Sequence, residues 1–144
     1  MNDRLTLAFL FLSGLLLLGI GTAILLVPHA FHASNGIVLG SDPSLLSEIR
    51  APGGLLTASA ILILIGAYRR SLRPMAMTLT VLVYGSFGLA RLLGLALDGI
   101  PSSGLVAATA IELIVAAIGF VILRRSSVSS AQSSRGLTAA PAVR

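Results

Sequence analysis

Two opposite charges lie inside stretches of sequence that are otherwise apolar. Arg91 interrupts the apolar residues 84–97, and Glu112 interrupts a second apolar stretch further along the chain. A charged side chain at the centre of a bilayer costs about 2.5–3.5 kcal/mol to insert, and such residues are often the ones that bind ions, protons or polar ligands. Pairing with an opposite charge recovers part of that cost. We therefore expect Arg91 and Glu112 to form an ion pair or a hydrogen-bonded contact.

Three more charged residues are expected near this pair, at the outer ends of the apolar stretches. Glu48 and Arg50 precede one stretch, and Asp98 follows Arg91 by seven residues, which places both on one face of a helix. The sequence therefore predicts an outward-facing polar cluster made of Glu48, Arg50, Arg91, Asp98 and Glu112. Two interpretations stay open. The cluster either holds the helices in register, or it forms the floor of a pocket for a polar head group, an anion or a proton.

The sequence carries no strong signal for a metal, a cofactor or catalysis. His29 and His32 are three residues apart, and a carboxylate such as Glu48 would complete a set of three metal ligands. Two ligands without an evident third are weak evidence, so we expect interfacial histidines and no metal. The chain has no cysteine, which excludes disulfides and cysteine-bound zinc. It also lacks a phosphate-binding loop and a GxSxG motif, and we expect neither a cofactor nor enzymatic activity.

The elements that position these residues are predicted to be membrane-spanning helices. Of the 144 residues, 56% are hydrophobic and 10% are charged, whereas a soluble domain carries about 25% charged residues. Crossing a bilayer core takes about 20 apolar residues, and the chain has such stretches at 5–27, 51–68, 75–97 and 102–123. The fold class expected is all-α, a four-transmembrane-helix bundle with antiparallel, up-down order. Residues 1–125 would form this domain, and residues 126–144, rich in serine and alanine, a disordered cytoplasmic tail.

Turn signals separate the expected helices. Asp42-Pro43 is a typical helix start, so the second helix is expected to begin near Pro43, after a polar loop at 29–42. The sequence Asp98-Gly99-Ile100-Pro101 predicts a tight turn between the third and fourth helices. At 1.5 Å per residue, Arg91 then lies roughly 10 Å and Glu112 roughly 13 Å below the outer ends of their helices. The two charges are therefore expected at similar depth.

Two rows of small residues are expected to face neighbouring helices. In the third helix they recur every four residues, at Ser86, Ala90 and Gly94. In the fourth helix a row of small residues shares the face of Glu112; its members are Ala108, Ala116 and Gly119.

Arginine placement predicts the orientation. All ten basic residues are arginines, and most lie just outside the apolar stretches: three at 69–73, two at 124–125 and one near the N-terminus. By the positive-inside rule, both termini and the 69–74 loop are cytoplasmic. This distribution differs from a phosphate-binding stripe, so the net charge of +5 does not indicate a nucleic-acid partner. The expected partner is the lipid bilayer, together with a membrane partner subunit or a second copy of the chain.

Short motifs in a fixed order give the chain a family resemblance. They are EIRAPGG at 48–54, GLARL at 88–92, DGIP at 98–101 and the glutamate at 112. In this order they resemble the bacterial four-helix membrane family catalogued as domain of unknown function 4345, over about residues 5–125. The resemblance implies an inner-membrane protein with these polar residues as its signature and implies no activity. The architecture is also similar to that of DoxX-like membrane proteins, without the paired cysteines that some of them use.

These observations favour a small, non-enzymatic integral membrane protein of a bacterial inner membrane. Its outward-facing polar cluster would bind a small or lipidic ligand, or would hold a partner in a larger assembly. The alternative is a small proton-coupled transporter, with Glu112 as the titrating group and Arg91 as its counter-charge. A cavity that reaches Glu112 would favour ligand or proton traffic, whereas a dry and fully paired cluster would favour a structural role.

Overall fold

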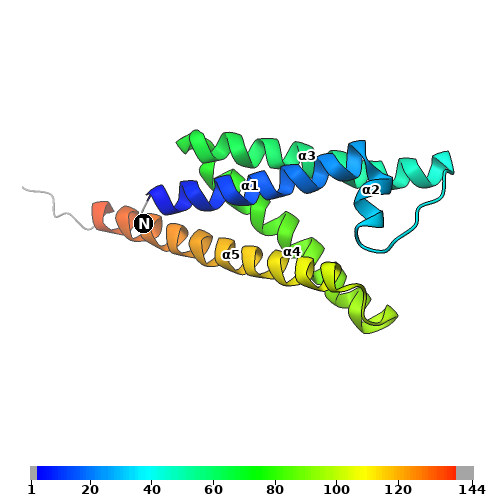
Figure 1. Cartoon of the computed structure of the whole chain (residues 1–144). Helices are drawn as coiled ribbons and strands as arrows, with labels where there is room; N and C mark the ends of the chain where they lie inside the picture. Colours follow the sequence, from blue (N-terminus) through cyan, green and yellow to red (C-terminus); the bar gives the residue numbers. More distant parts are fainter. Residues whose placement is uncertain (1–2, 139–144) are drawn as a thin grey trace, which may run out of the picture.

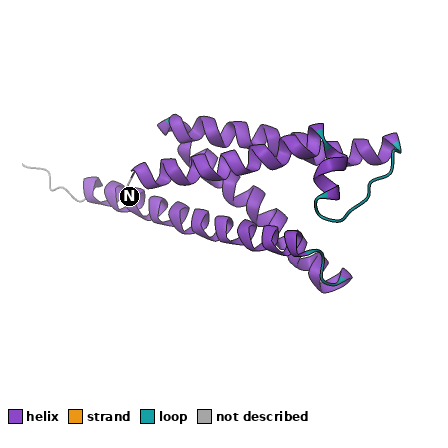
Figure 2. Ribbon diagram, viewed as in Figure 1, coloured by secondary structure: helices purple, strands orange, loops and turns teal. Residues whose placement is uncertain are grey.

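The computed structural model describes the backbone of residues 3–138 and the side chains of residues 3–125. Four long helices make up the fold: α1 (Asp3–Leu26), α3 (Pro43–Tyr68), α4 (Arg73–Asp98) and α5 (Ser103–Thr138). Two short ones join them, α2 (Pro28–Ala33) and η1 (Arg70–Leu72), and no strand occurs within residues 3–138 (Figures 1 and 2). The predicted all-α class is confirmed.

Four helical stretches, one for each long helix, are long and apolar enough to cross a membrane, and the third also includes η1. These stretches are Asp3–Leu26, Pro43–Tyr68, Arg70–Asp98 and Ser103–Arg125. Large apolar side chains are exposed on all four, for example Leu12, Leu62, Leu82 and Ile114. In water this surface would be costly, because each Å² of exposed apolar area costs about 25 cal/mol. The chain is therefore a membrane protein whose helices present their outer faces to lipid.

The helices form two hairpins that diverge from one end of the bundle to the other. α1 lies along α3, and α4 lies along α5 and also contacts α3. We call the end with residue 3, residues 69–73 and residues 124–125 the arginine end, and the end with residues 34–42 and 99–102 the loop end. At the arginine end α1 reaches α5, since a Cβ on Gly119 would lie 3.4 Å from the Phe9 ring. Toward the loop end α1 and α5 separate (Figure 1).

Glycine allows both hairpins to pack closely. A Cβ built on Gly21 of α1 would lie 2.7 Å from the backbone nitrogen of Thr57, and one on Gly53 of α3 would lie 2.8 Å from that of Leu25. The two backbones thus touch, as in membrane helix pairs that associate through small residues. In the other hairpin, a Cβ on Gly88 would lie 2.8 Å from the Leu113 side chain.

The small-residue row of α5 packs against α4 as predicted, but the row of α4 does not pack. Ala116 lies 3.7 Å from a Cβ built on Gly85, and Gly119 lies against Val81. Ser86 and Ala90, by contrast, are exposed. The face of α4 that meets α5 is offset by one residue from the predicted row and is formed by Gly85 and Gly88. Spacing alone could not distinguish these two rows.

Polar groups within the spans form hydrogen bonds in their own helix or to a neighbouring helix. Ser13, Thr80 and Thr109 each donate their hydroxyl to a carbonyl of their own helix. Tyr84 is 2% exposed, and its hydroxyl donates to the Ser13 carbonyl oxygen at 2.6 Å, which ties α4 to α1. Among the described side chains no buried polar atom lacks a hydrogen-bond partner, as a lipid environment requires.

The turn regions confirm one helix start and correct one loop. Asp42 caps α3 by accepting a hydrogen bond from the Leu45 backbone nitrogen at 2.9 Å, so the predicted start at Pro43 is confirmed. The predicted polar loop at 29–42 is wrong in its first part, because Pro28–Ala33 forms α2. Proline suits the first position of a helix, where its missing N–H is not needed. Pro28 therefore ends one helix and begins the next.

The N-terminus and the α3–η1–α4 connection are joined at the arginine end. Asp3 forms salt bridges with Arg70 at 2.7 Å and with Arg73 at 3.0 Å. Arg73 also donates to the Ala67 carbonyl near the end of α3. The three predicted arginine groups, at the N-terminus, at 69–73 and at 124–125, lie at one end of the bundle (Figure 1).

The helix bounds of α5 reach Thr138 and pass the expected end near residue 123. The side chains of residues 126–138 and the whole of residues 139–144 lie outside the described residues. The domain boundary at 125 and the disorder expected for 126–144 therefore stay predictions.

Candidate functional site

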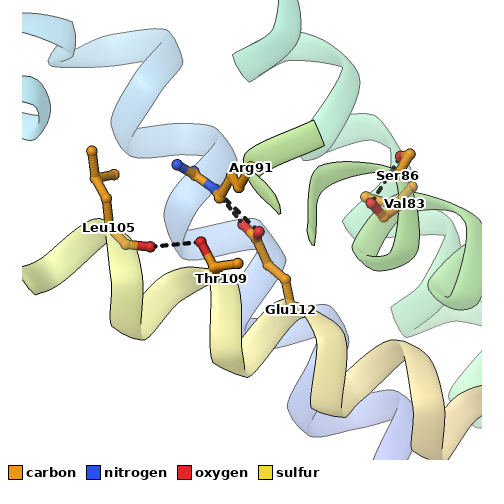
Figure 3. Close-up of polar contacts among 6 residues, drawn as sticks. All are labelled: Val83, Ser86, Arg91, Leu105, Thr109 and Glu112. Carbon is orange, nitrogen blue, oxygen red and sulfur yellow. Dashed lines mark hydrogen bonds and ion pairs between the residues drawn. The ribbon is translucent and has the colours of Figure 1, made fainter. Parts of the chain in front are cut away.

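The predicted pair of charges is present between α4 and α5. Arg91 donates from Nε to both carboxylate oxygens of Glu112, at 3.2 Å to Oε1 and 3.1 Å to Oε2 (Figure 3). The Glu112 side chain is 12% exposed and that of Arg91 33%. Among the described residues this is the one salt bridge between two spans away from the arginine end. The predicted ion pair is therefore confirmed, and its role has to come from its surroundings.

Close helix packing positions the pair. Gly88 lies one turn before Arg91 and admits the Leu113 side chain, next to Glu112, against the α4 backbone. Thr109 lies one turn before Glu112, and its hydroxyl donates to the Leu105 carbonyl rather than to the carboxylate (Figure 3). The Glu112 carboxylate thus has Arg91 as its partner and no hydroxyl donor among the described side chains of its own helix.

An apolar cavity of about 100 Å³ lies beside the pair, between the two hairpins. It forms on the loop-end side of the point where α1 and α5 meet, because the helices diverge there. Its wall is apolar apart from Tyr84, Arg91 and Glu112, and the Tyr84 hydroxyl is bonded to Ser13. The apolar wall is drawn from all four long helices and comprises Leu16, Leu17, Ile20, Ile24, Leu56, Val83, Phe87, Ala108 and Ile111.

A second hollow, of about 200 Å³, lies on the other side of Arg91, toward the loop end. Arg91 and Asp98 both line it, together with Gly94, Leu95, Gly99, Pro101, Leu105 and Thr109. Gly99 has φ of 97°, a conformation that glycine adopts readily, and this forms the turn at the rim. Three members of the predicted cluster, Arg91, Asp98 and Glu112, thus lie around two adjoining spaces.

Glu48 and Arg50 do not join this cluster. Both are exposed on the first turns of α3, and Arg50 lines a separate open groove of about 680 Å³ with residues of α1 and α3. The prediction grouped Glu48, Arg50 and Asp98 with the pair because all three lie near the outer ends of the helices. In the structure α3 lies against α1, and α4 and α5 diverge from them at this end (Figure 1).

The histidines form backbone contacts. His29 Nε2 lies 3.3 Å from the Gly40 carbonyl oxygen, and His32 Nδ1 lies 2.9 Å from that of Pro28. Within residues 3–125, no three residues of the types His, Cys, Asp and Glu lie close enough together to hold a metal ion.

The cavity lining is the part of the site that the sequence did not indicate. Leu16, Ile20, Ile24 and Ile111 are ordinary apolar residues of spanning helices, and the same residue types face lipid elsewhere. Tyr84 carried one signal, since it lies seven residues before Arg91 and shares its face.

Four apolar spans, two of which are joined by the Arg91–Glu112 ion pair, define a small polytopic membrane protein of the four-helix class. Within that class, the chain belongs to the family described as Domain of unknown function (DUF4345), whose model matches residues 5–123. No curated protein and no solved structure matches the chain significantly. The family predicted from the motifs is confirmed, while the looser similarity to DoxX-like proteins stays a hypothesis.

Proposed function

We propose that this protein binds a small amphipathic molecule dissolved in the membrane and performs no chemistry on it. The apolar part of the ligand would enter the cavity between the hairpins, and its polar head would lie at Arg91. The observation that carries this proposal is the position of Arg91, which lines the apolar cavity on one side and the second hollow on the other.

Most N–H donors of the Arg91 guanidinium group are not used by Glu112. An arginine carries five N–H donors, and Glu112 occupies the one on Nε. Among the described residues no group accepts a hydrogen bond from Nη1 or Nη2. A purely structural pair is stabilised most by the two-point contact that arginine forms with a carboxylate through parallel N–H groups. The arrangement observed leaves four donors for an acceptor such as a carboxylate or a phosphate.

The size of the cavity limits what it can hold. Sites for drug-sized ligands are about 300–1,000 Å³, and an apolar cavity of about 150 Å³ holds a molecule such as benzene. At about 100 Å³, this one fits a segment of an alkyl chain, and the remainder of the ligand would lie in lipid along the helices. This supports a lipid-like ligand over a compact water-soluble one.

Filling the cavity should remove binding without disturbing the ion pair. Ala108 lines the cavity, so we expect Ala108→Leu to lower the amount of bound ligand about tenfold, because the added carbons occupy the same space. Ala110 is exposed on the same helix, so Ala110→Leu serves as the matched control with no expected loss. Both variants would be purified in native lipid, and the molecules that stay bound would be quantified by mass spectrometry.

Equal retention by the two alanine variants would contradict ligand binding in this cavity. A bound molecule without an apolar chain would contradict the lipid-like class.

The second candidate is the proton-coupled transporter, which is supported by the Glu112 carboxylate lining a cavity beside its counter-charge. It differs from the first in that the ligand must cross the bilayer. Reconstituted vesicles would then accumulate the ligand only when a pH gradient is present. Assembly with a partner subunit or a second copy stays a prediction.

We also propose that the protein lies in a bacterial inner membrane with both termini in the cytoplasm. The gathering of the arginine groups at one end supports this orientation, because cytoplasmic flanks carry the excess of arginine. Reporter fusions at Arg73 and at Gly99 should report opposite sides of the membrane, with Arg73 cytoplasmic. A periplasmic signal from the fusion at Arg73 would reverse the orientation.

A further inference from the structure

The second hollow has a positively charged side chain, Arg91, at one end and a negatively charged one, Asp98, at the other. Asp98 Oδ2 would lie 3.7 Å from a Cβ on Gly94, so the carboxylate folds back along α4 in the direction of Arg91. No salt bridge among the described residues includes Asp98. An acidic residue in the last turn of a helix is unfavourable, because the partial charge there is negative. The Asp98 carboxylate is therefore unfavourable at this position, and no salt bridge within the described part of the chain offsets that cost.

The two charges follow a definite order along the membrane normal. Arg91 is seven residues before Asp98, so it lies roughly 10 Å deeper along the helix axis. In Figure 3 the guanidinium end of Arg91 reaches toward the side on which Leu105 lies, which is the loop end. A ligand head that enters from the loop end therefore meets a negative charge near the surface and a positive charge further in.

We propose that the head of the ligand is zwitterionic and of the phosphoethanolamine type. The phosphate would accept hydrogen bonds from Nη1 and Nη2 of Arg91, and the primary ammonium would donate to the Asp98 carboxylate. In a phosphoethanolamine lipid the phosphate is nearer the acyl chains and the ammonium nearer the water, which matches the order of the two charges. An anionic head without an ammonium, such as phosphoglycerol, would offer the Asp98 carboxylate no opposite charge. This inference rests on the proposed function and names the class of its ligand.

Lipids and water-soluble esters both carry this head, and the apolar cavity favours the lipid. The cavity and the hollow adjoin at Arg91, so a lipid whose phosphate lies at Arg91 has its glycerol and the start of its acyl chains beside the cavity. A soluble ester such as glycerophosphoethanolamine would leave the cavity empty.

Lipid selectivity tests the inference. The full chain would be equilibrated in mixed micelles with equal amounts of phosphatidylethanolamine and phosphatidylglycerol that carry the same acyl chains. Native mass spectrometry would then measure the lipid retained. We expect the wild type to retain phosphatidylethanolamine over phosphatidylglycerol about threefold to fivefold, which is the range that an ion pair with an exposed carboxylate can supply. We expect Asp98→Asn to remove the preference and Glu48→Gln, an exposed carboxylate at the same end, to keep it.

Separate outcomes address the inference and the proposed function. Equal retention of the two lipids by the wild type, or a preference that survives in Asp98→Asn, would overturn the zwitterionic head while lipid binding stands. No lipid retained by the wild type, or retention unchanged in Arg91→Leu/Glu112→Leu, would overturn the proposed function as well. Displacement of the lipid by equimolar glycerophosphoethanolamine would overturn the assignment to a lipid. Asp98 is exposed beside a turn, so Asp98→Asn is expected to fold.

Discussion

Replacing Arg91 by leucine is expected to lower the free energy of unfolding by about 2–3 kcal/mol. The change leaves Glu112, whose side chain is 12% exposed, without its counter-charge inside a span. Breaking a fully buried pair costs about 3–5 kcal/mol, and we expect less here because Arg91 itself is 33% exposed. Reversible unfolding in mixed micelles would measure the difference, with Ser86→Ala as a control at an exposed position of the same helix.

Replacing Glu112 by leucine should lower the free energy of unfolding by less than Arg91→Leu does. In Glu112→Leu the long Arg91 side chain keeps access to the second hollow, where Asp98 lies, so its charge can move toward water. The short glutamate has no such route when Arg91 is removed. The double variant Arg91→Leu/Glu112→Leu should return to within about 1 kcal/mol of the wild type, because apolar residues of similar size often replace a buried pair without loss. Additive losses in the double variant would show that the two residues are not coupled.

The same double variant separates the two interpretations of the pair. If the pair only holds the helices in register, a stable double variant retains everything that the wild type binds. If Arg91 holds the head of a ligand, the double variant folds and binds nothing. Stability and binding therefore have to be measured on one preparation.

The sequence predicted the spans and the central contact because strong physical constraints act on both. A lipid solvent admits few structures, and four long apolar stretches become four helices. Arg91 and Glu112 lie at similar depth on consecutive antiparallel helices, so the need for a counter-charge pairs them. Asp42 and Pro43 were equally informative, since the cap and the first helical position each require a particular residue type.

The arrangement of the two hairpins could not be predicted in the same way. Exposed and buried residues are both apolar in lipid, so hydrophobicity does not show which face of a helix meets its neighbours. The prediction therefore chose Ser86 and Ala90 for the contact face of α4, whereas Gly85 and Gly88 meet α5. It also placed Glu48 and Arg50 in the cluster, because the sequence indicates how deep a residue lies in the membrane but not where its helix lies in the membrane plane.

Adding a single methyl group at Gly53 is expected to separate α1 from α3. A Cβ there would lie 2.8 Å from the Leu25 backbone nitrogen and 3.1 Å from the Gly21 carbonyl oxygen. Backbone atoms cannot turn aside as a side chain can, so Gly53→Ala requires the helices to shift. Overpacking of this kind typically costs 1–3 kcal/mol, and we expect about 2–3 kcal/mol from unfolding measurements in mixed micelles.

The neighbouring residue provides the matched control. A Cβ on Gly54 would meet nothing within 4 Å, so Gly54→Ala should leave the stability unchanged or raise it by up to about 1 kcal/mol, through the higher helix propensity of alanine. Gly21→Ala should behave like Gly53→Ala, and Gly19→Ala like Gly54→Ala, because Gly21 meets the Thr57 backbone and Gly19 meets nothing. Equal effects of Gly53→Ala and Gly54→Ala would rule out the backbone contact.

The glycine contact also connects the fold to the site. Ile24 of α1 and Leu56 of α3 both line the cavity, and they lie within three residues of Gly21 and Gly53 along the chain. A shift that relieves the clash at Gly53 therefore moves two walls of the cavity while Arg91 and Glu112, on the other hairpin, keep their contact. Gly53→Ala should accordingly lower ligand retention with the Arg91–Glu112 pair intact, and Gly54→Ala should not. Retention that falls equally in both variants would mean that the cavity does not depend on the α1–α3 contact.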